Sequence, residues 1–300
     1  MRIGFRIFSG FAWLVSKLPD TMLYGLSGFL YFLLRYVSGY RNKIIRENLT
    51  KCFPEFSQKK INAIITEYYQ HMADLIIEVM KTPGFSADQI KNRFSFKNAE
   101  LIYKLQESGR SFILLTGHLG NWEWLGPGMQ LNFPAFSGYA VVKPIKNPDF
   151  HKYMSDLRRI HKSDSLIPYK QTLRFMIRNK DKLTLTLFAA DQTPHKGGIK
   201  FNAYFFNRLT PFFTGFESIA RMLDEAVVFA DVYRTRRGHY EVEFRLITDT
   251  PKSIAENEIT LEFIRLLEEA IRKRPYNWLW SHRRWKHAPK VDQQENQDRA

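Results

Sequence analysis

The stretch SFILLTGHLGNWEW, residues 111–124, decides the fold of this chain. Its first part, Ser111–Thr116, is a short apolar run of the kind that forms a buried strand. The residues that follow, 121–131, have the composition of a helix. Gly117 and Gly120 lie between the two and supply the backbone freedom for a tight turn. Strand, turn and helix in this order form the basic unit of an α/β domain.

The same alternation of elements continues along the chain. A helix is predicted at 57–81 with Ser57 as its N-cap, and a second at 98–108 with Gly109 at its C-terminus. The remaining predicted elements are strands at 139–142, 183–189, 227–233 and 240–247, and helices at 148–161, 214–223 and 258–273. The sequence therefore predicts an α/β fold with a largely parallel central sheet and helices on both faces.

Composition limits the class of protein. A 300-residue chain with 44% hydrophobic residues can bury a sizeable core as one domain. Its net charge of +15 favours polyanionic partners, such as anionic lipid, phosphorylated substrates, an acidic carrier protein or nucleic acid. The single cysteine, Cys52, excludes an internal disulfide and any cysteine-rich metal site. We expect it to be a small buried apolar residue.

The N-terminus contains two apolar stretches, 5–18 and 21–37. Each is marginal for a span, which needs about 20 mainly apolar residues. Arg35 ends the uncharged part of the second stretch, and Arg41, Lys43 and Arg46 follow it. We expect a short uncleaved anchor or an interfacial helix, and the alternative is a buried helical pair. The predicted organisation is therefore a membrane-anchoring or interfacial region at 1–50, an α/β domain at 51–290 and a flexible tail at 291–300.

The candidate catalytic residues follow the strand at 111–116. Ligands of open α/β sheets bind at strand carboxyl ends, so His118 and Glu123 are well placed. On a continuous helix they would lie about 140° apart, so they can meet only if His118 lies in the loop and the helix begins near Asn121. A carboxylate on one imidazole nitrogen would let the other take a proton from a hydroxyl. In the alternative reading, His118 caps the turn and Glu123 is a solvated helix residue.

Longer motifs add a family resemblance. The chain resembles the late acyltransferases of lipid A biosynthesis and, more distantly, the glycerolipid acyltransferases with their H-x4-D motif. The resemblance covers about residues 5–287. Its motifs are NLTKCFPE at 48–55, GHLGNWEW at 117–124, KPIKNP at 143–148, Arg158-Arg159, Asp191-Gln192, FFNRLTPFFTG at 205–215 and WLWSHRRWKH at 278–287.

The resemblance implies roles for single residues. His118 would be the general base and Glu123 its partner. Arg158 or Arg159 would contact the acceptor's phosphate or the thioester. The other implied substrate-binding residues are Asn121, Lys143, Asp191 and Gln192. Lys143 stands where the family usually has Arg, so it could hold a phosphate only as a point charge.

The resemblance also implies the reaction. An acyl chain would move from an acyl-carrier-protein or CoA thioester to a hydroxyl of a lipid A precursor, at the cytoplasmic side of the bacterial inner membrane, with no metal or cofactor. Two departures from the family pattern, FFTG at 212–215 and TPHKGGIKF at 193–201, leave another lipid acceptor open.

Three other classes of protein compete with this interpretation. A nucleic-acid-binding protein would explain the charge but not the apolar N-terminus, so we expect no nucleic acid partner. A hydrolase is disfavoured because the H-E-x-x-H and G-x-S-x-G motifs are missing. The third class is a membrane scaffold.

The basic and tryptophan-rich run at 272–287 is expected to face substrate or membrane headgroups, or else to form an edge strand.

Overall fold

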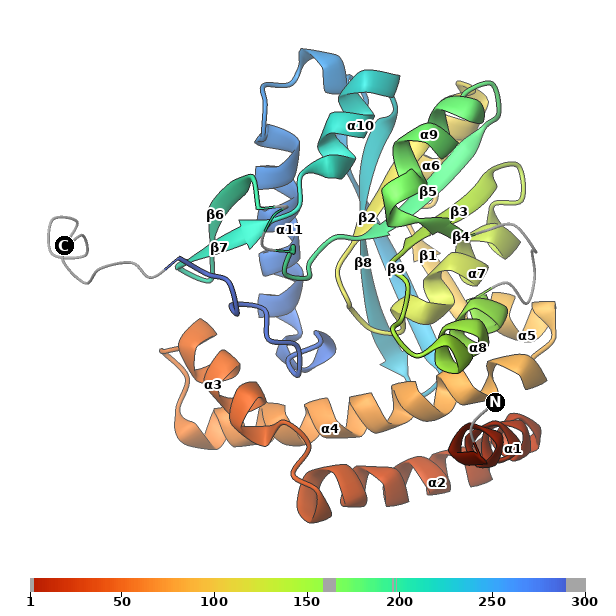
Figure 1. Ribbon diagram of the computed structural model, residues 1–300, viewed down its shortest axis with the longest axis vertical. Coiled ribbons are helices and arrows are strands. Elements are labelled where there is room, and N and C mark those ends of the chain that lie inside the picture. Colours follow the sequence, from red (N-terminus) through yellow and green to blue (C-terminus); the bar gives the residue numbers. More distant parts are fainter. Residues whose placement is uncertain (1–2, 159–165, 196, 198, 290–300) are drawn as a thin grey trace, which may run out of the picture.

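The chain folds around one mixed sheet, seen in a computed structural model that describes residues 3–158, 166–195, 197 and 199–289 (Figure 1). The strand order is β1-β9-β8-β2-β5-β3-β4. Their bounds are β1 Phe94–Lys97, β9 His239–Thr248, β8 Ala226–Arg236, β2 Phe112–Thr116, β5 Thr184–Ala189, β3 Ser137–Val142 and β4 Leu166–Pro168. The five strands from β8 to β4 are parallel, whereas β9 runs antiparallel to β8. The predicted largely parallel sheet is confirmed.

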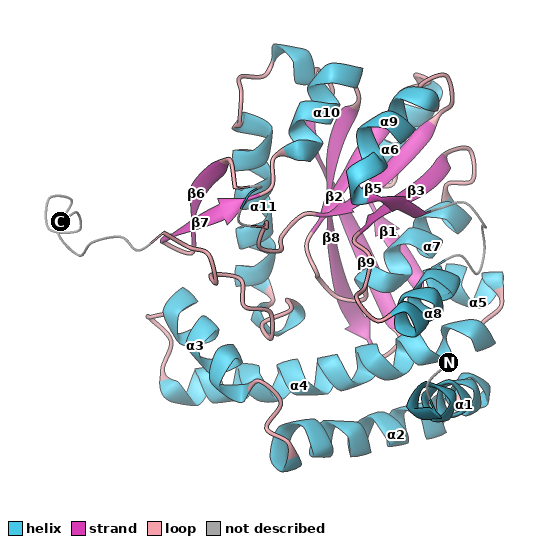
Figure 2. Cartoon of the chain, viewed as in Figure 1, coloured by secondary structure: helices cyan, strands magenta, loops and turns pink. Residues whose placement is uncertain are grey.

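Helices cover this sheet (Figure 2). They are α4 Gln58–Lys81, α5 Ala87–Lys91, α6 Glu100–Glu107, α7 Trp122–Asn132, α8 Pro148–Arg158, α9 Thr172–Arg178, α10 Gly215–Leu223 and α11 Glu258–Lys273. Every residue of β2 is buried, although successive side chains point to opposite faces. Both faces of the central strands are therefore covered, as a parallel sheet requires.

Several elements were not predicted. A separate antiparallel hairpin, β6 Phe201–Phe205 and β7 Arg208–Phe212, occupies a region that the sequence marks only as rich in phenylalanine. The edge strands β1 and β4 are four and three residues long, too short for a periodic pattern. The helix predicted at 148–161 is observed to Arg158, and its last three residues lie outside the described part of the chain, as does the predicted tail at 291–300.

Two helices, α1 Ile3–Lys17 and α2 Asp20–Phe32, form the N-terminal region, followed by a π-helical turn at Leu33–Val37. They pack on α4 through a small cluster of Val15, Leu23 and Ile77. Figure 1 shows α4 running between this pair and the sheet. The other side of the pair exposes apolar side chains. Among the described residues, the helices are too short or too polar to cross a bilayer.

Helix α3, Asn42–Cys52, connects this pair to α4. Its buried side chains Ile45, Leu49 and Cys52 belong to the main hydrophobic core. Burial raises the pKa of the Cys52 thiol to about 12, so the thiol stays protonated and unreactive. The prediction that Cys52 is a small buried residue is confirmed.

Candidate active site

The loop between β2 and α7 carries His118. Gly120 turns this loop with a positive φ of +53°, and a Cβ there would lie 2.8 Å from the carbonyl oxygen of Val232. The Gly120 amide donates to the carbonyl oxygen of Asn277 at 3.1 Å. A side chain at position 120 would therefore push the loop away from β8. The loop is held on both sides by segments far away in the sequence.

Asp191 holds the imidazole of His118. One carboxylate oxygen lies 2.5 Å from Nδ1 of His118, and the other accepts the His118 backbone amide at 2.9 Å. The indole of Trp278 donates to the same carboxylate at 2.6 Å. The two residues meet because β2 and β5 are parallel neighbours, with Thr116 opposite Ala189. His118 and Asp191 each follow their strand by two residues.

This contact changes the titration of both groups. Burial would lower the pKa of His118, but the negative charge of Asp191 and its hydrogen bond outweigh burial and raise that pKa above its usual value. Burial would raise the pKa of Asp191, but the charge and hydrogen bonds of His118 outweigh it and hold that pKa well below its usual range. Asp191 is therefore a carboxylate at neutral pH.

The second imidazole nitrogen faces the cavity. Nε2 of His118 lies 2.9 Å from the side-chain amide nitrogen of Gln192. With Nδ1–H donated to Asp191, the neutral ring has its lone pair at Nε2, and the Gln192 amide donates to it. This assignment follows from the hydrogen-bond network. A hydroxyl that replaced the exposed Gln192 amide would donate its proton to the same atom.

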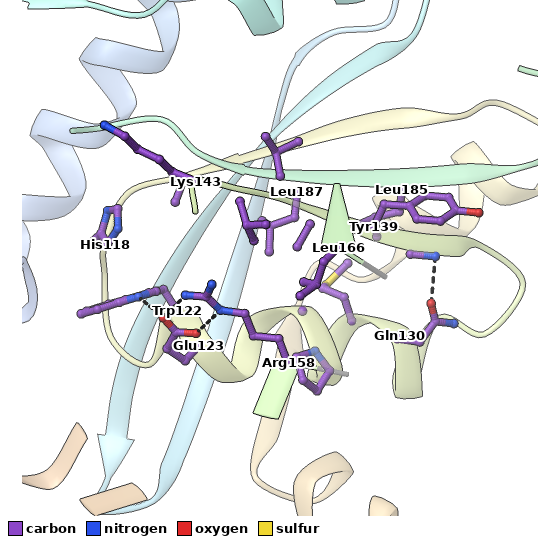
Figure 3. A pocket seen from close by; sticks show the side chains of 18 of the residues that line it. His118, Trp122, Glu123, Gln130, Tyr139, Lys143, Arg158, Leu166, Leu185 and Leu187 are labelled. Carbon is purple, nitrogen blue, oxygen red and sulfur yellow. Dashed lines mark hydrogen bonds and ion pairs between the residues drawn. The ribbon is translucent and has the colours of Figure 1, made fainter. Parts of the chain in front are cut away.

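The expected contact between His118 and Glu123 is not formed. Glu123 accepts two hydrogen bonds from Arg158, both at 2.7 Å, and one from the indole of Trp122 at 3.2 Å. Figure 3 shows the Glu123–Arg158 pair with His118 standing apart from it. Helix α7 begins at Trp122, so Glu123 lies in its first turn and faces α8 rather than the loop. The prediction that Glu123 holds the imidazole is wrong in geometry, and Asp191 takes that place.

Asn121 is the N-cap of α7. Its side-chain oxygen accepts the Trp124 amide at 3.1 Å, and its side-chain nitrogen donates to Glu78 at 2.9 Å. The residue is completely buried. The structure thus places Asn121 in the scaffold of the loop and not on the cavity wall, away from the substrate contact that the family resemblance implies.

An apolar cavity of about 380 Å³ opens beside His118 (Figure 3). Gly126 and Pro127 of α7 contribute to its wall. Larger apolar side chains line the rest: Met129, Phe133, Phe136, Leu166, Leu185 and Leu187. Gln130 lies at the end far from His118 in this view, where it accepts the Gly138 amide at 2.8 Å. The polar groups gather at the opposite end: His118, Glu123, Lys143, Arg158 and Gln192.

The predicted site residues thus fall into four groups. Lys143, Arg158 and Gln192 line the cavity with His118, whereas Asp191 stands behind His118. Asn121 lies in the scaffold, and Arg159 is outside the described residues. Within the described ranges, no cluster of His, Cys, Asp and Glu could hold a metal ion.

The C-terminal run has a different role from the expected one. Trp278 and Trp280 are 2% and 0% exposed, so they belong to the core and do not face a membrane. The segment forms turns and one bridge, between Leu119 and Trp278, and no edge strand. The sequence marked Trp278 as part of a family motif but gave no sign that it holds Asp191. The edge-to-face contact of Trp122 with His118, with ring centroids 5.1 Å apart, was also not foreseen.

Comparison with known proteins identifies the family of this chain. The family model described as bacterial lipid A biosynthesis acyltransferase matches residues 2–287. The chain is 23% identical over 282 residues to the lipid A biosynthesis palmitoleoyltransferase of Escherichia coli (strain K12), covering 93% of this chain and 90% of that protein. It is 24% identical over 285 residues to the lipid A biosynthesis lauroyltransferase of the same organism, with the same coverage. The chain belongs to the bacterial lipid A biosynthesis acyltransferase family and is an O-acyltransferase.

Proposed function

We propose that this enzyme transfers a fatty acyl chain from a thioester to a hydroxyl of a lipid A precursor, with His118 as the general base and Asp191 as its partner. The observation that carries the proposal is the position of His118. Its Nδ1 is bonded to a buried carboxylate, and its Nε2 stands at the polar end of an apolar cavity. Glu123 is reassigned from partner of the base to partner of Arg158.

The proposed chemistry is a direct attack. The acceptor hydroxyl gives its proton to Nε2 of His118 while its oxygen attacks the thioester carbonyl carbon. Asp191 stabilises the imidazolium that forms. When the tetrahedral intermediate collapses, the carbon–sulfur bond breaks and the leaving thiolate takes the proton back from His118. The products are an ester and a free thiol.

The cavity suits an acyl chain. Its wall is mostly aliphatic and aromatic, and pockets for small ligands have volumes in this range. If a methylene needs about the volume of a liquid water molecule, roughly 30 Å³, a cavity of about 380 Å³ holds on the order of a dozen such groups. The thioester carbonyl would then lie beside His118, at the polar end.

The cations at that end suit a phosphorylated acceptor. Arg158 is fixed by its two hydrogen bonds to Glu123, and its side chain remains 26% exposed. Lys143 lines the same opening. A guanidinium already oriented by a carboxylate loses little conformational freedom when it binds an anion. We therefore assign Arg158 and Lys143 to the acceptor's phosphate or to the thioester region.

The N-terminal helices suit a membrane surface. Helix α1 exposes Ile3, Ile7 and Leu14 at 78%, 69% and 58%, spaced along one side. Met22 and Phe29 of α2 are also more than half exposed. Exposed apolar rows on short helices favour burial at the headgroup boundary. We propose that α1 and α2 lie in the interface of the bacterial inner membrane, on its cytoplasmic side, where the lipid acceptor is found.

The donor remains a choice between acyl carrier protein and CoA, and the net charge of +15 favours either of these anionic carriers. The alternative acceptor is another lipid with a free hydroxyl or amine. Parallel reactions with both donors, and with a lipid A precursor and a lysophospholipid as acceptors, separate these cases by the acylated product.

The proposal is tested with His118→Ala. Acyl transfer from a twelve-carbon thioester to the lipid A precursor should fall by at least about 100-fold, the range for losing a general base, while the thermal midpoint changes little. His239→Ala, at the start of β9, is the matched control and should keep full activity. A His118→Ala variant as active as wild type would exclude the mechanism.

A further inference from the structure

Glu78 is a carboxylate buried within the scaffold of the active-site loop. It lies near the C-terminal end of α4 and has no exposed surface. Four donors converge on it. Tyr24 and the Gly238 amide donate to one oxygen, both at 3.1 Å, and Asn121 and Tyr240 donate to the other at 2.9 and 2.6 Å. Glu78 does not line the cavity, so the proposed reaction does not use it directly.

These donors come from parts of the chain that are far apart. Tyr24 belongs to α2, Gly238 to the turn between β8 and β9, and Tyr240 to β9. Gly238 has a φ of +70°, and a Cβ there would lie 2.2 Å from the Tyr24 hydroxyl oxygen. The glycine is therefore needed for the backbone to reach the cluster. Asn121 is the only one of these four groups that belongs to the active-site loop.

The contact with Asn121 reaches the active site in one step. Asn121 stands between His118 and Glu123 and caps α7 through its side-chain oxygen. An amide side chain can present either its oxygen or its nitrogen to the helix. Because ionised Glu78 only accepts hydrogen bonds, it fixes the nitrogen of Asn121 toward itself and the oxygen toward the Trp124 amide.

From this geometry we infer that Glu78 is a positioning residue of the acyl-transfer reaction. It orients Asn121, and Asn121 fixes the turn from which His118 and Glu123 project. The inference rests on the proposed function of His118, but the orientation of the loop can be measured without it. Two oxygens with about four acceptor sites match the four donors. A neutral amide in place of the carboxylate would leave at least one donor facing another donor.

Opposing effects act on the pKa of Glu78. Burial is the largest effect and raises the pKa of Glu78 to about 7, helped by the nearby charge of Asp74 and opposed by the hydrogen bonds from Tyr240, Asn121 and Tyr24. The protein therefore keeps an acidic side chain where burial disfavours its charged form. An apolar side chain at this position would leave the four donors without an acceptor inside the protein.

The test compares Glu78→Gln with Asp74→Asn. Asp74 is also fully buried, one turn earlier on the same helix, and it binds Ser27, Arg234 and Arg237 rather than the loop. We expect Glu78→Gln to lower kcat by about 10- to 100-fold, the effect of a small misplacement of catalytic groups, with KM nearly unchanged. Asp74→Asn should lower the thermal midpoint but leave kcat of the folded enzyme intact.

Two further variants separate positioning from folding. Asn121→Ser keeps an N-cap but cannot reach Glu78, and it should lose as much kcat as Glu78→Gln. In the double variant Glu78→Gln with Asn121→Asp, the introduced amide donates to the introduced carboxylate, which still caps α7, so kcat should recover at least in part. Unchanged kcat in both Glu78→Gln and Asn121→Ser would overturn the inference.

Amide hydrogen exchange gives a readout that does not depend on activity. Exchange at the start of α7, over residues 118–126, should become about fivefold faster in Glu78→Gln, as expected for a weakened N-cap, and should stay unchanged in Asp74→Asn. If the wild-type enzyme transfers no acyl chain, the proposed function fails and this measurement still decides the role of Glu78. Unchanged exchange in Glu78→Gln would reject it.

Discussion

Nδ1 of His118 lies 2.5 Å from a carboxylate oxygen of Asp191, a residue 73 positions later in the chain. The contact exists because two parallel strands end side by side and each is followed by a functional side chain. Glu123 is much closer in sequence but is bound to Arg158. The proton-transfer pair that we propose is therefore formed by two residues that are far apart in the sequence.

Replacing Asp191 should change the pH dependence of the reaction. The base works as neutral imidazole, so kcat/KM falls as the pH drops through the pKa of His118. Asp191 raises that pKa. In Asp191→Asn the acid limb of the kcat/KM profile should therefore move to lower pH, and the plateau should fall by about 100-fold or more because the imidazolium loses its partner. Glu123→Gln is the control, and a larger shift of the acid limb in that variant would contradict the assignment.

Glu123 and Arg158 should behave as one unit. Their side chains are 14% and 26% exposed and share two hydrogen bonds. Glu123→Gln and Arg158→Met should each weaken kcat/KM for a phosphorylated acceptor. The double variant should be little worse than Arg158→Met, with a coupling free energy of about 0.5–3 kcal/mol. Strictly additive losses would mean that the two residues act independently.

Filling the cavity should change the preferred chain length. Gly126 lies on the cavity wall, and an added Cβ would meet only Leu187, at 3.9 Å. A larger side chain, as in Gly126→Met, would take up space that the acyl chain needs. We expect kcat/KM to fall about tenfold or more for a sixteen-carbon thioester and much less for an eight-carbon one, since each excluded methylene forfeits about 0.8 kcal/mol of burial. An equal loss for both chains would place the acyl chain elsewhere.

Charges on the exposed row of α1 should weaken membrane binding. Ile7→Glu and Leu14→Glu each remove an apolar side chain worth about 1.5–3 kcal/mol when buried. Binding to vesicles of anionic phospholipid, measured by flotation, should fall by about tenfold or more for each. Met222→Glu is the matched control: Met222 is also 58% exposed but lies on α10, at the opposite end of the molecule in Figure 1. A similar loss in the control would point to a general charge effect.

Helices and strands could be predicted where a short stretch of sequence carries a clear pattern of apolar residues. The buried strands β2, β5 and β8 consist mainly of apolar residues, and α4 has a regular apolar periodicity with Ser57 bonded to the Lys60 amide as its N-cap. The short strands β1 and β4 gave no such pattern. The hairpin of β6 and β7 was missed because β7 contains Pro211 and its buried residues do not alternate, although those of β6 do.

The sequence predicted which residues belong to the site better than it predicted which of them contact one another. His118, Glu123, Arg158, Asp191 and Gln192 do gather in one region. Which carboxylate holds the imidazole depends on the order of strands in the sheet and on where α7 begins, and neither can be deduced from residue spacing. The contribution of Trp278 requires the C-terminal segment to return to the loop, which no local pattern indicates.

The bond from Trp278 to Asp191 has a consequence for biosynthesis. Together with the hydrogen bond from Gly120 to Asn277, it means that the last tenth of the described chain holds in place the loop that carries His118. The chain must be synthesised past Trp278 before His118 acquires its final environment. A chain cut before Trp278 would therefore retain α1, α2 and His118 but lack the indole that donates to Asp191.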